Sequence, residues 1–594
     1  MDRRKKAFYI LSLSACIIFY LIFALVDGPV ICVDSQSYIS MDITREPLYP
    51  AFLALLRMVP GATADFAGIP AYLYLAVYIQ SIVWGFATWL LGKTAGEIYA
   101  GIAFRSDKNT ESFMGFGKHD FRGALISCAA MLIQASVSLL NRFAASRGSM
   151  YSECIMTESL AMPVFIIFSL ELYKYYSLVA SERCTGRSGN CDHDPSGNCD
   201  HGSSGNCNHG LSGNCNHDPS GNCNHGSQRL KTREGKCFAA LIILAIIMID
   251  LRKQMMVVVV IWAAMSVLYD LFMKGRSPRR FLKTIIAIAA VMLISSGVDC
   301  TYNYVVRGAF IEHAGNYMGQ LCTLVYSSDS GDAELFDKYG DEETKALYVE
   351  IISESESQGL TIGSAPTDGS WIDLEDHFAE SYDVIGYDII NPVVQEYIMD
   401  TYGYGEVDEF LCYDRLMSRM CSVLRHQDKG DILRVYGVNF LTAITDSNAR
   451  VMTLGLQISV AMYALFLALY VVCRVRGNLL MRRGMTDGNF DNGNYCKPDY
   501  SAQMSEDAAD PDGTFVDIRP TAVFVFAEVS LGGIIINSLV VSAVIFPQAR
   551  YMIYGMGLFY TALMLLIIGN VRLVRSMRKS QTIGMTQISQ NSPE

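Results

Sequence analysis

Long uninterrupted apolar blocks constrain this chain more than any other feature of its sequence. Most are about 20 residues long, the length that an α-helix needs to cross a bilayer core. Residues of the AVILMFWYC set make up 51% of the 594 positions and charged residues 18%, against about 25% charged in soluble proteins. These features exclude a soluble enzyme, a nucleic-acid-binding protein and a disordered scaffold. We therefore expect an all-α polytopic membrane protein with about ten transmembrane helices.

The expected spans are 7–26, 71–92, 121–140, 156–178, 237–250, 254–273, 281–299, 451–473, 520–546 and 551–571. The fifth is the weakest, because it is short and ends at once in Asp250-Leu-Arg-Lys253. Basic residues collect near one set of span ends, at 3–6, 229–236, 274–283, 474–483 and 572–579. Since the excess of Lys and Arg stays in the cytoplasm, both termini are predicted to be cytoplasmic, in a multi-pass protein of the plasma membrane. The loops that then face outward are 27–70, 141–155, 300–450 and 547–550.

Charge and composition divide the chain further. Residues 301–450 hold 27 Asp and Glu against 9 Lys and Arg, a net of −18 within a total of −12, so the remainder sums to +6. The predicted parts are an N-terminal membrane module (1–300) with outer loop 27–70, an outer acidic domain (301–450), a C-terminal membrane module (451–575) with cytoplasmic loop 474–519, and a tail (576–594). The acidic domain is expected to be α-rich or of mixed secondary structure. Its expected role is to recognise an acceptor or to cover the site, and the alternative is a passive helical cap.

An eight-residue unit, Ser-Gly-Asn-Cys-Asp/Asn-His-x-x, repeats within the cytoplasmic segment 184–228 and places Cys at 191, 199, 207, 215 and 223. Cys-x-His pairs are possible ligands of Zn²⁺ or Cu⁺. The alternative is a tandem duplication in a loop too polar to bury anything. The monotonous spacing favours the duplication, and we expect this segment to be disordered.

The first outer loop contains two carboxylates, Asp34 and Asp42, close to Arg45. A carboxylate at the membrane surface can act as a general base or bind a divalent cation. Asp34 is equally suited to capping a short helix over 35–41. Pro47 and Pro50 are expected to hold residues 45–50 extended, because proline fixes φ and restricts the residue before it.

The sequence here resembles a known family. Asp34-Ser-x-Ser-Tyr38, followed by Arg45-x-Pro-Leu-Tyr-Pro50 and an apolar segment, is similar to the first external loop of the GT-C membrane glycosyltransferases, particularly the protein O-mannosyltransferase and aminoarabinose transferase family. Thr157-Glu-Ser-Leu160 and Arg550-Tyr551 resemble further short segments of that family, and Asp250-Leu-Arg-Lys253 is a weaker match that lacks a proline. Ser35 stands where many members have a second acidic residue, which leaves the metal dependence unknown.

The resemblance implies a GT-C-like fold and transfer of a sugar from a polyprenyl-phosphate donor to a protein, lipid or glycan acceptor at the non-cytoplasmic face. It places the catalytic base at Asp34, with Glu158 in support of it or bound to an acceptor hydroxyl. An ordinary helix-start carboxylate is the other interpretation of Glu158. Tyr38, Asp42 and Tyr551 are the expected substrate-binding residues. The expected partners are these substrates and membrane lipids, with no nucleic acid. No cofactor is certain, and a divalent cation is possible.

Cations on the outer side run against the topological bias and are therefore candidates for binding the donor phosphate. Arginine suits this role because its planar fork can grip two oxygens. We expect Arg252, Arg550 and Arg45 to do so, with Arg142, Arg147 and Lys253 as further candidates; snorkelling to headgroups is the alternative for each. Two rival functions remain: a transporter or flippase of lipid-linked glycans, and a non-catalytic membrane partner in cell-envelope glycan assembly.

Overall fold

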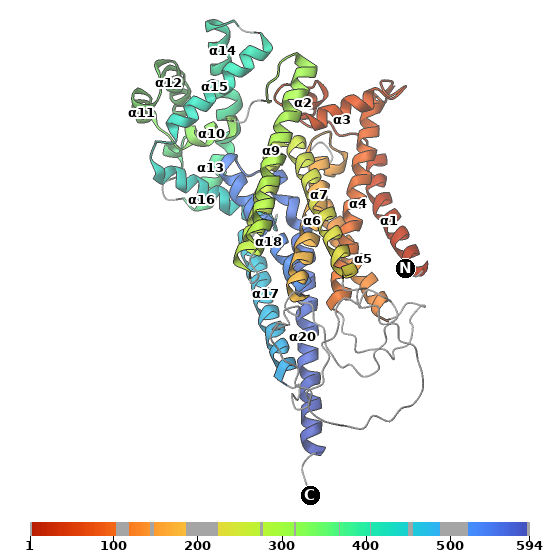
Figure 1. Cartoon of the computed structure of the whole chain (residues 1–594). Helices are drawn as coiled ribbons and strands as arrows, with labels where there is room; N and C mark the ends of the chain where they lie inside the picture. Colours follow the sequence, from red (N-terminus) through yellow and green to blue (C-terminus); the bar gives the residue numbers. More distant parts are fainter. Residues whose placement is uncertain are drawn as a thin grey trace, which may run out of the picture.

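The structure is a computed structural model, and it describes residues 3–102, 118–142, 148–185, 224–273, 277–313, 317–366, 369–403, 405–449, 455–486 and 521–590. These residues form a bundle of long helices with a second helical body at one end (Figure 1). We call this end, which also holds α2 and α3, the domain end. The C-terminus lies at the opposite end of the bundle.

Nine helices or helix runs in the described part are long and apolar enough to cross a membrane. They are α1 (Arg3–Asp27), α4 (Ala71–Ile102), α5 (Lys118–Leu140), α6 (Glu158–Thr185), the run of η3 (Lys253–Met256), α8 (Val257–Ser266) and the π-helix η4 (Val267–Phe272), then α9 (Pro278–Arg307), α17 (Gly455–Thr486), α18 (Thr521–Val544), and the run of α19 (Ala549–Met552), η9 (Ile553–Gly555) and α20 (Met556–Gln590). The prediction of an all-α, multi-pass membrane protein is confirmed at this level.

One of the ten expected spans, the fifth (237–250), is not one of the nine. It lies in α7 (Asn224–Leu251), which packs between α6 and α9. The first half of α7 contains Arg229, Lys231, Arg233, Glu234 and Lys236, so its uncharged part is shorter than the other spans. The predicted disordered repeat segment, 184–228, is helical at both of its ends, which belong to α6 and α7, while residues 186–223 lie outside the described residues. Of the predicted loop 474–519, residues 474–486 belong to α17 and 487–519 lie outside the described part.

Small residues bring the first helices of the bundle into close contact. A Cβ at Gly85 of α4 would lie 2.6 Å from the backbone of Ile17 in α1. A Cβ at Gly92 would clash with the Met131 side chain of α5. Apolar helices in lipid associate through packing of this kind rather than through the hydrophobic effect. The continuous core that results includes α6, α7, α8, α18 and α20.

The second helical body lies within 317–446 and has a hydrophobic core of its own. Its elements are α10 (Met318–Tyr326), η5 (Ser330–Asp332), α11 (Ala333–Tyr339), α12 (Glu342–Ser357), η6 (Ile362–Ser364), α13 (Trp371–Asp383), the π-helix η7 (Val384–Ile390), α14 (Asn391–Thr401), α15 (Glu406–Leu424) and α16 (Lys429–Asp446). Asp341 and Ser370 cap α12 and α13 by accepting backbone N–H bonds. The body packs on the bundle mainly through α16 against α18 and α17.

Shorter elements shape the domain end: α2 (Ser35–Ile39), α3 (Leu48–Arg57), the two-residue strands β1 (Asp65–Phe66) and β2 (Ile69–Pro70), which pair antiparallel, and η1 (Tyr151–Glu153). The expectation of an extended segment after Arg45 is wrong. Pro47 has helical angles, φ −69° and ψ −34°, and α3 begins directly after it, with Pro50 in its first turn. Proline is tolerated there because the first N–H groups of a helix have no intrahelical acceptor.

Candidate functional site

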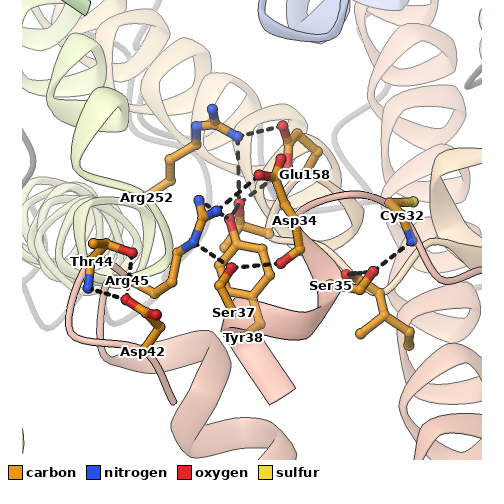
Figure 2. A network of polar contacts seen from close by, with 12 residues as sticks. Cys32, Asp34, Ser35, Ser37, Tyr38, Asp42, Thr44, Arg45, Glu158 and Arg252 are labelled. Carbon is orange, nitrogen blue, oxygen red and sulfur yellow. Dashed lines mark hydrogen bonds and ion pairs between the residues drawn. The ribbon is translucent and has the colours of Figure 1, made fainter. Parts of the chain in front are cut away.

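The carboxylate of Asp34 lies between two arginines. Arg45 Nη2 is 2.8 Å from Oδ1, as Figure 2 shows. Arg550 Nη1 is 2.8 Å from Oδ2. Asp34 occupies the N-cap position of α2, yet its side chain makes no capping hydrogen bond. Helix capping therefore does not account for this side chain, which instead joins the first loop to a residue 516 positions further along the chain.

Arg45 is held by its own loop. Its Nε donates to Ser37 Oγ at 2.7 Å, and its guanidinium lies 4.7 Å from the centre of the Tyr38 ring. Tyr38 is buried, with its hydroxyl 3.2 Å from Thr157 Oγ1. These contacts fix the Arg45 fork toward Asp34 and connect the loop to the start of α6.

Glu158, the first residue of α6, is 1% exposed. It forms an ion pair with Arg252, and Arg550 Nε lies 3.8 Å from the same oxygen. Thr157 Oγ1 donates to its other oxygen at 3.1 Å. A carboxylate this deeply buried requires such partners, so Glu158 is more than an ordinary residue at a helix start.

Arg252 stands at the corner between α7 and η3, where the backbone is extended (φ −161°, ψ 117°). The adjacent backbone N–H of Lys253 donates to Glu46 Oε1 at 2.8 Å, which ties this corner to the first loop. Arg252 and Arg550 also lie 4.5 and 4.9 Å from the centre of the Tyr551 ring. Tyr551 thus supports both guanidinium groups in this apolar setting through cation–π contacts.

We call Asp34, Arg45, Glu158, Arg252 and Arg550 the arginine cluster. Three guanidinium groups face two carboxylates, a net charge of +1. Burial opposes ionisation of Asp34, but the two arginines outweigh it and hold the pKa of its carboxyl below the usual range. Asp34 is therefore ionised at neutral pH, and the cluster retains a positive charge that can attract an anion.

The cluster remains partly accessible. The side chains of Arg45, Asp34 and Arg550 are 26%, 22% and 20% exposed. Guanidinium forks bind phosphate oxygens in pairs, and a nearby carboxylate can accept a proton. Chemically, the arrangement suits binding of a phosphate ester next to a group that can deprotonate a hydroxyl.

The other residues expected at the site are placed differently. Asp42 accepts hydrogen bonds from the backbone and hydroxyl of Thr44, at 2.9 and 2.7 Å, and these are local contacts of the loop (Figure 2). Arg142 is exposed, its guanidinium 5.9 Å from the Phe23 ring centre. Arg147 lies outside the described residues. Within the described ranges, no group of three or more His, Cys, Asp and Glu side chains is arranged to hold a metal ion.

Two residues of the second helical body approach the cluster and were not expected. Asp383, at the end of α13, is exposed, and its charge interacts with those of Arg550 and Asp34. Tyr387 in η7 interacts with the charge of Asp34. Tyr387 is 66% exposed. Nothing in their local sequence indicates this position, because it depends on how two separate helical bodies pack.

A second polar site adjoins the first. A cavity of about 60 Å³ is lined by Pro47, Ile249, Asp250, Lys253, Met256, Met292, Ser295, Ser296, Asp299, Glu312 and His313. His313 Nδ1 lies 2.5 Å from Asp299, and Lys253 Nζ lies 2.7 Å from Glu312. Glu46 lies 4.0 Å from His313. We call these charged groups, with Asp250, the acidic pocket.

No protein-family model, curated protein or solved structure matches this chain.

Proposed function

We propose that this protein is a membrane glycosyltransferase of the GT-C type. It moves a sugar from a polyprenyl-phosphate donor to a protein, lipid or glycan acceptor at the non-cytoplasmic face of the plasma membrane. The proposal rests on the short sequence motifs described above and on one observation: residues from three of these motifs, together with Arg252, meet in a net-positive cluster around the ionised Asp34.

In the proposed reaction, Asp34 accepts the proton of an acceptor hydroxyl, which attacks the anomeric carbon as the bond to the lipid phosphate breaks. Arg550, Arg252 and Arg45 stabilise the negative charge left on the phosphate, a contribution that is often the largest in catalysis. Glu158 fixes Arg252 and Arg550. Tyr38 and Tyr551 support the guanidinium groups and contact substrate.

The low pKa of Asp34 would make it a weak base in the unoccupied protein. Binding of the donor corrects this. An anionic phosphate placed on Arg45 and Arg550 neutralises the two charges that depress the pKa and adds a negative charge nearby, and both changes raise it. The donor thus strengthens the base that its own reaction needs.

The helix arrangement also suits a lipid-linked donor. Nine helices of the described part can cross a membrane, and the cluster lies at one end of their bundle (Figure 1). The basic residues that favour the cytoplasm lie near the opposite span ends, so the site would open away from the cytosol. At that boundary a lipid phosphate and a water-soluble acceptor can meet.

The test is sugar transfer by the purified protein, with polyprenyl-phosphate sugars as donors and mass spectrometry of envelope glycans from producing cells to identify the acceptor. Asp34→Asn should lower turnover by at least about 10³-fold at unchanged protein level, as loss of an essential proton acceptor does. Asp42→Asn is the control from the same loop, and its turnover should fall far less. Near-normal turnover of Asp34→Asn would refute the assigned base. Movement of intact donor across vesicles without cleavage of the sugar–phosphate bond would indicate a flippase instead.

A further inference from the structure

The two loops that deliver Asp34 and Glu158 to the site meet at a pair of cysteines. Cys32 lies two residues before Asp34, and Cys154 lies four residues before Glu158. Both are buried, at 7% and 0% exposure, and the structure describes both as free thiols. Most other described cysteines lie on or beside the long helices, where Cys packs as a small apolar residue.

The backbone fixes these two residues near each other. Val30 and Cys154 form an isolated parallel β-bridge, in which Val30 N–H donates to Glu153 O at 2.9 Å and Ile155 N–H donates to Val30 O at 3.0 Å. The chain turns at Cys32, whose N–H donates to Ser35 Oγ at 2.7 Å, and this hydroxyl donates to Ile155 O at 2.8 Å (Figure 2). Cys32 Sγ donates to Val30 O at 3.8 Å and Cys154 Sγ donates to Met150 O at 3.6 Å, so both thiols lie beside the bridge that joins the two loops.

We propose that Cys32 and Cys154 form a disulfide that joins the two loops immediately behind the arginine cluster. The bond would close a long stretch of chain, which includes α4 and α5, with one covalent link. It would hold Asp34 and Glu158 in register even when no substrate is bound. The pairing rests on the orientation proposed above, since disulfides persist in compartments outside the cytosol.

The two thiols differ in a way that gives the reaction a direction. The neighbouring Cys154 thiol lowers the pKa of Cys32, whereas the Cys32 thiol and burial raise the pKa of Cys154. The Cys32 thiolate therefore attacks a disulfide of a thiol oxidoreductase or a small disulfide molecule, forming a mixed disulfide and releasing one thiolate. That thiolate takes the proton of Cys154, whose sulfur then attacks Cys32 Sγ and releases the second thiol. Two protein thiols lose two electrons and two protons, and the donor disulfide gains them.

The direct test uses the full chain in its native membrane. Thiols are blocked with N-ethylmaleimide under denaturing conditions, and the protein is digested without reductant. A linked peptide pair containing Cys32 and Cys154, which separates after reduction, is the expected result. Recovery of both cysteines as alkylated thiols would overturn the proposal. Cys473, buried within α17, should be alkylated in the same digest and controls for complete blocking.

Substitution adds a second readout. With a disulfide, Cys32→Ser, Cys154→Ser and the double variant should all lower the melting temperature by the same amount, because each removes the same bond. Reductant should lower the melting temperature of the wild-type protein to that of the variants. Additive losses in the double variant would show two independently packed thiols and contradict the bond. The Asp34→Asn variant should still yield the disulfide-linked peptides of Cys32 and Cys154. The disulfide and the sugar-transfer activity can therefore be refuted independently of each other.

Discussion

The arginine cluster and the acidic pocket lie next to each other but have opposite charge. Two dipeptides divide between them: Arg45 and Arg252 enter the cluster, while their neighbours Glu46 and Lys253 turn toward the pocket. The cluster has three cations against two anions. The pocket has four carboxylates, Glu46, Asp250, Asp299 and Glu312, with Lys253 and His313.

This difference bears on what can bind. A phosphate ester is attracted to the cluster and repelled by the carboxylates beside it, which would fix the position of its charge. The cluster is also assembled from four distant parts of the chain, whereas the pocket is made mostly by the end of α7, the second half of α9 and the segment after α9. Charge excess and long-range assembly distinguish the proposed reaction centre from its neighbour.

Glu158→Gln and Glu312→Gln give the sharpest comparison, because their carboxylates pair with consecutive residues, Arg252 and Lys253. Glu158 is 1% exposed, so its loss leaves a buried cation uncompensated at a cost of about 3–5 kcal/mol. Glu312 is 43% exposed, and its loss should cost less than about 1 kcal/mol. Thermal unfolding in detergent or nanodiscs measures both. Equal losses would mean that the cluster is no more tightly held than the surface pair.

The second prediction concerns donor use. Arg550→Ala should reduce turnover of the lipid-phosphate donor by about 10²–10³-fold, the range for removing one group that stabilises developing charge. The effect on acceptor KM should be smaller, because the guanidinium faces Asp34 and Glu158 rather than a separate acceptor surface. Lys253→Ala removes a neighbouring cation that points into the acidic pocket and is the matched control. Equal effects on donor and acceptor would argue against a phosphate-binding role for Arg550.

The third prediction uses pH. Arg45 and Arg550 hold the pKa of Asp34 below its usual value, so the free protein should keep its base ionised throughout the mildly acidic range. The acid limb of kcat/KM, which reports the free protein, should therefore lie at lower pH than the acid limb of kcat, which reports the donor complex. Arg45→Gln should move the acid limb of kcat/KM to higher pH, because it removes one of the two positive charges that stabilise the ionised carboxylate. Coincident limbs in the wild type would show that the donor phosphate does not act on Asp34.

Most of the membrane architecture follows from the sequence, because a bilayer imposes a fixed apolar length on each span. The exception, residues 237–250, belongs to a long helix whose charged first half shortens its apolar part. At Pro47 and Pro50 two preferences compete: a residue before proline favours extended backbone, whereas proline itself is tolerated in the first turn of a helix. The structure resolves that competition by placing α3 directly after Pro47.

The site was less accessible to sequence reasoning. Asp34 fits a helix cap and an ion pair equally well until Arg550 is placed beside it. Asp42 is, like Asp34, a carboxylate in the first outer loop, but it accepts a hydrogen bond from the neighbouring Thr44 hydroxyl and stays outside the cluster. Ser37 and Thr157 orient Arg45 and Glu158 through single hydroxyl contacts, which a pattern of residue types does not reveal. Asp383 and Tyr387 come near only through the packing of the second helical body on the bundle.

Asp383 gives the smallest and most specific prediction. It is exposed, it belongs to the second helical body, and its charge interacts with Arg550 and Asp34. Asp383→Asn removes one negative charge near the cluster, which should strengthen donor binding a few-fold and leave the free energy of unfolding within about 0.5 kcal/mol of wild type, as for most surface substitutions. Asp373→Asn, on the same helix but within its first turn, is a control with the same change in charge. Donor titration at low and high salt measures the difference, since screening should remove an electrostatic effect. Equal donor affinity in Asp383→Asn and Asp373→Asn at low salt would mean that the second body covers the site without taking part in its electrostatics.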